Sequence, residues 1–67
     1  MQNKKFIEVI HHILAENNLS QQKFADIIGV NQTAVSKWLL GTRKPTYDSI
    51  EMICKKFNIE PNDLFDI

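Results

Sequence analysis

The apolar residues of this 67-residue chain recur at helical spacing rather than alternating as they do in strands. From residue 3 to residue 17 they fall along one stripe of a helix, and from residue 47 to residue 57 they form a second stripe. The two stripes consist of Phe6, Ile7, Ile10, Ile13 and Leu14, and of Ile50, Ile53, Cys54 and Phe57. Helices are therefore expected over about 3–17 and 47–57.

A shorter helix is expected over residues 21–28. Ser20 stands where a hydroxyl can accept from the exposed amides of the first turn. Leu19 and Phe24 have the spacing of a hydrophobic staple, which fixes the angle at which the chain enters a helix. Gly29 is expected to end this helix with a positive φ, since the chain reverses there and any side chain would cost about 1–2 kcal/mol.

The next helix, over residues 32–40, repeats this construction. Asn31 can cap it, Val30 and Val35 have the staple spacing, and Gly41 can end it.

The last part of the chain predicts two more helices. Thr46 can cap the helix over 47–57, and Asn58 can end it. Pro61 suits the first turn of a short final helix over 61–65. No stretch resembles a strand or a linker, so we expect an all-α fold of five helices in a single domain spanning 1–67.

The helices over 21–28 and 32–40, joined by a short turn at a glycine, predict a helix-turn-helix. Any pair of packed antiparallel helices needs some of these features. Alanine, glycine four residues later, an aliphatic residue six after that and tryptophan three further on is far more restrictive. The residues expected to set the angle between the helices are Ala25, Ile28, Gly29, Val30, Val35 and Trp38.

The run L-S-Q-x-x-F-A-x-x-x-G-V-x-x-x-x-V-S-x-W-x-x-G-x-x-x-P resembles the Cro/C1-type (XRE-like) helix-turn-helix family of phage repressors and bacterial regulators. The likeness continues into I-x-x-I-C-K-K-F-N-I-x-P-x-x-L-F and covers residues from about 6 to 65. It implies a compact five-helix lambda-repressor-like DNA-binding domain whose helix-turn-helix is formed by helices 2 and 3. It also implies sequence-specific binding of double-stranded DNA, usually by a symmetric dimer.

Carried over by position, the resemblance indicates which residues would contact DNA. The front and outer side of the third helix would reach base edges in the major groove, where glutamine can pair with adenine and lysine with guanine. These base-reading residues are Gln32, Thr33, Ser36 and Lys37, and the residues expected at phosphates are Gln21, Lys23, Arg43 and Lys44. Relatives often carry polar or charged groups where this chain has Leu40 and Thr42, so a weaker phosphate grip is expected there.

Several of these residues also have a simpler interpretation. Gln32, Thr33 and Lys37 could be ordinary residues on a solvent-exposed helix face. Arg43 and Lys44 could be loop residues that serve only solubility. Trp38 shares a face with Val35 and Leu39, so a place in the core is expected rather than a stacking role. His11 and His12 point about 100° apart on a helix and do not converge on a metal. Cys54, on an apolar stripe, is expected to be a small buried hydrophobe.

The charges of the chain cancel, with eight basic and eight acidic side chains, which alone argues against a polyanionic partner. Their distribution is uneven. Between residues 20 and 46 there are four basic residues and one acidic residue, whereas the remainder has four basic and seven acidic. This segregation predicts a basic face on the helix-turn-helix and an acidic end directed away from DNA, unless it is a chance feature of a solvated surface.

The expected function is a DNA-binding transcriptional regulator, taken here to be a repressor. One copy would make few phosphate contacts, so we expect a homodimer on a pseudo-palindromic operator, with Phe65 and Ile67 as apolar candidates for the dimer contact. The alternative is a protein–protein interaction module, such as an antitoxin or co-regulator, that keeps the fold with weak or no specific DNA binding.

Other classes of function are not expected. The chain has no acid–base pair, metal cluster or phosphate-cradling glycine loop, so we expect no enzyme, cofactor, metal or small-molecule ligand. Its single cysteine excludes an internal disulfide and a zinc finger. No apolar run is long enough to span a bilayer, and no signal segment is recognisable, which together predict a cytoplasmic protein. The resemblance to the Cro/C1-type family implies a bacterial or phage origin.

Overall fold

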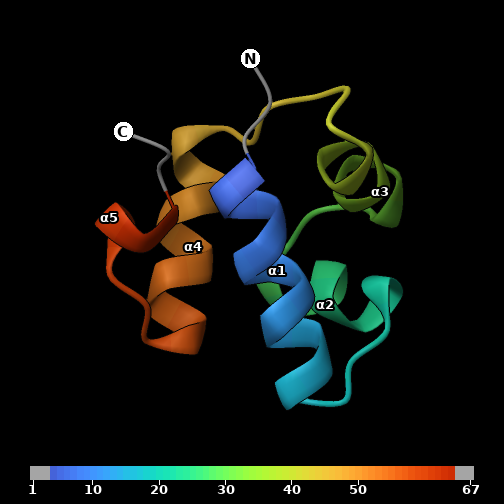
Figure 1. Cartoon of the computed structure of the whole chain (residues 1–67). Helices are drawn as coiled ribbons and strands as arrows, with labels where there is room; N and C mark the ends of the chain where they lie inside the picture. Colours follow the sequence, from blue (N-terminus) through green and yellow to red (C-terminus); the bar gives the residue numbers. More distant parts are fainter. Residues whose placement is uncertain (1–3, 65–67) are drawn as a thin grey trace.

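The computed structural model describes residues 4–64, which form helices and no strand. The elements are α1 (Lys4–Glu16), α2 (Gln21–Ile28), α3 (Gln32–Leu40), α4 (Tyr47–Phe57) and α5 (Pro61–Leu64). In Figure 1, α1 crosses the front of the molecule, α2 and α3 lie to its right, and α4 and α5 lie to its left. No helix among the described residues is long and apolar enough to cross a membrane.

The expectation of five full-length helices is wrong. Four helices, α1 to α4, have eight residues or more, whereas α5 is a single turn of four residues. One turn closes too few backbone hydrogen bonds to be stable by itself, so α5 depends on its packing. Leu64, which is buried in the core, supplies that packing. Phe65, expected to extend this helix, and Ile67 lie outside the described residues.

The N-termini of α2, α3 and α4 are capped by the residues predicted to do so. Ser20 Oγ, Asn31 Oδ1 and Thr46 Oγ1 each accept from the backbone N–H three residues on, at 3.1, 2.9 and 3.2 Å. All three capping residues have extended backbone, as an N-cap requires. These caps account for the observed starts of three helices.

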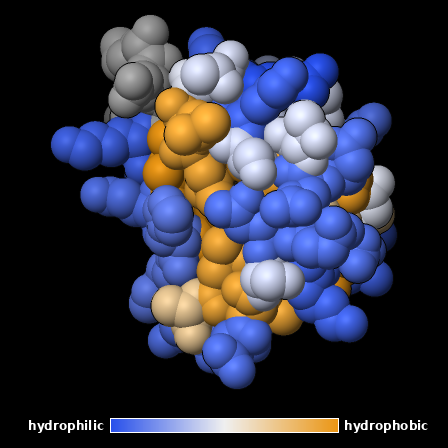
Figure 2. All heavy atoms as spheres, turned by 90° about the vertical axis from the view of Figure 1, so that its right-hand side faces the viewer, coloured by the Kyte–Doolittle hydropathy of each residue, from blue (hydrophilic) through white to orange (hydrophobic). Residues whose placement is uncertain are grey.

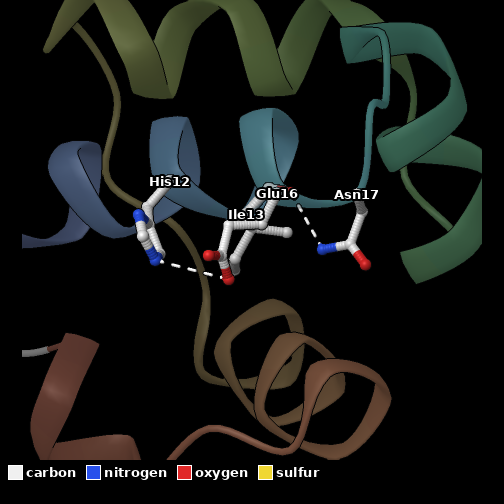
Figure 3. Close-up of polar contacts among 4 residues, drawn as sticks. All are labelled: His12, Ile13, Glu16 and Asn17. Carbon is white, nitrogen blue, oxygen red and sulfur yellow. Dashed lines mark hydrogen bonds and ion pairs between the residues drawn. The ribbon is translucent and has the colours of Figure 1, made fainter.

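Two asparagines end α1, one through a hydrogen bond (Figure 3) and the other through a left-handed backbone conformation. Asn17 Nδ2 donates to the carbonyl of Ile13 at 2.9 Å, and Asn18 has a φ of 53°. In the same turn His12 Nε2 lies 3.5 Å from a carboxylate oxygen of Glu16, and both side chains are largely exposed. Such an exposed pair adds little stability, so the asparagines do most to end α1.

The core is formed by the apolar stripes of all the helices. Two aromatic pairs join helices that are distant in sequence. Phe6 on α1 meets Trp38 on α3 edge to face with ring centroids 5.8 Å apart, and Phe24 on α2 stacks on Phe57 of α4 at 5.5 Å. Both geometries are favourable for aromatic rings. They tie α1 and α4 to the helix-turn-helix, and the buried apolar residues are Phe6, Ile10, Ile13, Phe24, Ala25, Ile28, Val35, Trp38, Ile50, Ile53 and Leu64.

Candidate nucleic-acid interface

The turn between α2 and α3 is built around Gly29. Its φ is 80°, in the left-handed region. The backbone N–H groups of Gly29 and Val30 both donate to the carbonyl of Ala25, at 2.9 and 3.0 Å. Ala25 is fully buried where α2 packs against α3, while Val30 is half-buried against the core. These two hydrogen bonds close the C-terminal end of α2, and α3 begins only a few residues later.

Replacing Gly29 with alanine is expected to lower the free energy of unfolding by about 1–2 kcal/mol. The cause is purely conformational, since an added Cβ would meet no atom within 4 Å. Urea unfolding measures the change. Gly29→Asn is the matched control, because asparagine tolerates positive φ and should cost less than alanine. Equal losses for the two variants would contradict a conformational cause.

The two sides of α3 have opposite character. Val35 and Trp38 are buried against the core. Gln32, Thr33 and Lys37 are exposed, and none of the three side chains has a hydrogen-bond or ion-pair partner among the described residues. Donors and acceptors that are free in the folded chain are available to an external partner. The front of α3 thus presents an amide, a hydroxyl and an ammonium group to solvent.

Ser36 lies in a different environment from these three residues. It is half-buried, and its Oγ donates to Oε1 of Gln21 at 2.8 Å. Gln21 is the first residue of α2 and is half-buried too. The structure therefore brings these two predicted contact residues together, on the seam between the helices. Sequence reasoning missed this link because the two residues are 15 positions apart.

The basic residues around the helix-turn-helix are exposed and carry no internal ion pair. Lys23, Arg43 and Lys44 have no carboxylate partner in the part of the chain that the structure describes. Asp26, the single acidic residue between positions 20 and 46, accepts a hydrogen bond from Gln22 Nε2 at 3.0 Å. Among the described side chains, therefore, none neutralises the positive charges of this region through an ion pair.

The end of α3 uses its polar groups for its own backbone. The Thr42 hydroxyl donates to the carbonyl of Lys37 at 3.2 Å, and the Thr42 amide donates to the same carbonyl at 3.0 Å. Gly41 has a φ of 79° and completes the left-handed cap. Leu40 is 73% exposed beside this cap. Thr42 thus serves as a capping residue, a role that its sequence position alone did not indicate.

An aromatic side chain next to the basic loop was not among the predicted contact residues. Tyr47, the first residue of α4, is 82% exposed. With Lys44 it lines a hollow of about 550 Å³ whose floor includes Phe6 and Leu64. No sequence pattern indicated this exposure, since a residue directly after an N-cap can also be half-buried, as Gln21 is. Tyr47 adds a phenolic hydroxyl and an exposed ring to this edge.

Figure 2 looks onto the side of the molecule that carries α2 and α3. Hydrophilic residues cover most of this side, and a column of hydrophobic residues runs down it left of centre. The residues described form no group of three or more histidine, cysteine, aspartate or glutamate side chains able to hold a metal ion. The candidate interface thus consists of the polar front of α3 together with the exposed cationic groups of Lys23 and Arg43.

The sequence that forms this interface is shared with a known protein family. A family model described as helix-turn-helix matches residues 10–64, which is most of the chain. The chain belongs to the Cro/C1-type helix-turn-helix family. This family is one of DNA-binding regulators of transcription rather than enzymes. The match covers α2, α3 and α4 entirely, so the candidate interface lies within it.

Three characterised proteins are similar to this Cro/C1-type domain. The control protein C.BamHI of Bacillus amyloliquefaciens is 38% identical over 53 residues, which cover 79% of this chain and 65% of that protein. The transcriptional activator BcrR of Enterococcus faecalis is 32% identical over 60 residues, covering 90% and 29%. The antitoxin PezA of Streptococcus pneumoniae is 33% identical over 48 residues, covering 72% and 30%. The matched segment thus spans less than two thirds of each relative.

Proposed function

We propose that this Cro/C1-type domain is a sequence-specific regulator of transcription that inserts α3 into the major groove of double-stranded DNA. The major groove admits one α-helix, and the N-terminal residues of that helix meet the base edges. Gln32 and Thr33 open α3, and Lys37 follows one turn later. These three residues are proposed to read bases. Gln21, Lys23, Arg43 and Lys44 are proposed to contact phosphates.

The observation that carries this proposal is the free polar front of α3. Gln32, Thr33 and Lys37 are exposed and without partners among the described residues, while Val35 and Trp38 on the opposite side of the same helix are buried. The uncompensated charges of Lys23 and Arg43 lie on the adjoining helix and loop. A helix held rigidly by its apolar side, with its polar side unoccupied, suits readout of base edges.

We further propose that two copies bind together. One copy offers few cationic groups, and the chain as a whole is neutral. Tight binding at physiological salt needs more phosphate contacts than one such domain supplies. Two copies related by a two-fold axis would occupy half-sites about 34–36 Å apart on a pseudo-palindromic operator. A pair bound at a promoter would block transcription, so we propose that the protein is a repressor. The similar protein BcrR is a transcriptional activator, so activation is the alternative outcome.

Selection of bound duplexes from a random pool tests this function. The protein is mixed with the pool at two salt concentrations, and the retained duplexes are sequenced. An enriched palindrome would support sequence-specific binding by a symmetric pair. Enrichment of a single half-site would contradict the pairing, and no enrichment at either salt concentration would contradict specific DNA binding.

Arg43→Ala is expected to weaken binding to all duplexes and to flatten the dependence of log K on log salt by about one unit for each copy bound. The reason is that Arg43, exposed in the loop after α3, would neutralise one phosphate and release its counterion. Binding titrations at several salt concentrations measure the slope. Lys55→Ala is the matched control, because Lys55 lies in the last turn of α4 and should leave the slope unchanged. Equal slopes for Arg43→Ala and the parent would remove Arg43 from the phosphate contacts.

A second candidate function is a protein–protein interaction module, such as an antitoxin or co-regulator. Two observations favour it, namely the likeness to the antitoxin PezA and the exposure of Leu40 at the end of α3. An apolar side chain there adds nothing to phosphate binding and suits a protein partner. Under this alternative the random-pool selection yields no enriched sequence at either salt concentration.

A further inference from the structure

One hydrogen bond in the helix-turn-helix joins α2 and α3 through side chains alone. Ser36 Oγ donates to Gln21 Oε1 at 2.8 Å, and both residues are half-buried. The capping bonds of Ser20 and Asn31, by contrast, each serve a single helix. A serine inside a helix commonly bonds a backbone carbonyl of its own helix. The hydroxyl proton of Ser36 is directed to the neighbouring helix instead.

The chemistry of the glutamine side chain gives this bond a consequence. Its amide has an accepting end, Oε1, and a donating end, Nε2. A phosphate oxygen only accepts, so a glutamine at a phosphate must present Nε2. Left unrestrained, the long side chain of Gln21 samples many rotamers and can present either end. By donating to Oε1, Ser36 occupies the accepting end and leaves both N–H groups of Nε2 available to an anion.

We propose that Ser36 is a positioning residue, whose hydroxyl orients the Gln21 amide so that Nε2 donates to a DNA phosphate at the start of α2. This inference rests on the proposed function, in which Gln21 contacts a phosphate. The free amides and partial positive charge of the first turn of α2 act in the same direction. Ser36 then acts on DNA through Gln21, rather than reading a base itself.

The experiment uses a 20-base-pair duplex of arbitrary sequence at low salt, since a phosphate contact does not require the operator. The chains compared are the parent, Ser36→Ala, Gln21→Ala, the double variant and Ser36→Thr. Each single alanine variant should weaken binding by about 2–10-fold for each copy bound, the value of one hydrogen bond. The double variant should bind as Gln21→Ala does, and Ser36→Thr should restore the parent affinity. The salt slope should not change, because the glutamine is uncharged.

Nuclear magnetic resonance of the nitrogen-labelled protein reports on the amide directly. In the parent, the Nε2 proton resonances of Gln21 should shift when the duplex is added. In Ser36→Ala the two protons should shift far less, although the circular dichroism spectrum still shows a folded helical protein. A residue that only held α2 against α3 would leave the amide shift in place.

The outcomes separate this inference from the function on which it rests. If the parent fails to bind any duplex at low salt, the proposed function fails and the positioning role with it. If Gln21→Ala binds more weakly but Ser36→Ala binds like the parent, Gln21 remains a contact and the positioning role is wrong. If Ser36→Ala weakens binding equally in the parent and in the Gln21→Ala background, Ser36 acts independently of Gln21, which also overturns the proposal.

Discussion

Replacing Trp38 with alanine should lower the free energy of unfolding by about 3–5 kcal/mol, as expected for removing a large buried aromatic side chain. Trp38 is only 4% exposed, and its ring meets Phe6 of α1 edge to face at 5.8 Å. The substitution therefore removes transfer energy, leaves a cavity and breaks the aromatic contact between α1 and α3. A domain of this size has a total stability of roughly 3–10 kcal/mol, so the variant should be largely unfolded at 37 °C.

Urea unfolding followed by circular dichroism measures this loss. Tyr47→Ala is the matched control, since it removes an aromatic side chain that is 82% exposed and should change stability by less than about 0.5 kcal/mol. Trp38→Phe keeps a ring beside Phe6 and should lose much less than the alanine variant. A loss below about 1 kcal/mol for Trp38→Ala would contradict its place in the core between α3 and α1.

The sequence predicted the fold well because its signals are local. An N-cap needs only a hydroxyl or amide three residues before the N–H that it accepts from, so Ser20, Asn31 and Thr46 could be assigned from the sequence alone. Positive φ is similarly local, and Gly29 adopts it as expected. Apolar spacing predicted that Trp38 faces the core, as its burial confirms.

The parts that sequence reasoning missed depend on contacts between elements or on length. The bond from Ser36 to Gln21 requires the packing angle of α2 and α3, which no short pattern specifies. The Thr42 hydroxyl could have contacted a phosphate or its own helix, and only the path of the loop sends it to the Lys37 carbonyl. The last helix was predicted from Pro61 onward, but a proline marks where a helix starts and not how many turns follow.

Charge illustrates the same division between local and spatial information. The excess of basic residues between positions 20 and 46 is visible in the sequence. Whether it acts as a positive surface depends on pairing, which the structure supplies for the described residues: Asp26 is held by Gln22, and the lysines and Arg43 have no carboxylate partner. A chain of zero net charge can in this way carry a local positive surface, because its basic residues are concentrated on one segment and its acidic residues lie mostly elsewhere.

Gln32→Ala should remove about 1–3 kcal/mol of discrimination at one base pair of the operator, which corresponds to roughly 5- to 150-fold in relative affinity. Gln32 is the first residue of α3, it is exposed, and no described residue bonds its amide. Its Oε1 and Nε2 atoms are therefore free to pair with N6 and N7 of an adenine. Because no core contact is lost, the unfolding midpoint should stay close to that of the parent.

The measurement compares the four base pairs at each position of the selected operator, for the parent and the variant. Gln22→Ala is the matched control, since Gln22 is an exposed glutamine on α2 whose amide is bonded to Asp26. This control should keep every base preference. Gln32→Ala should lose its preference at one position in each half-site and keep the rest, because a single amide pairs with a single base. If the variant selected the same operator with the same discrimination as the parent, Gln32 would not be a base-reading residue and α3 would have to enter the groove in another register.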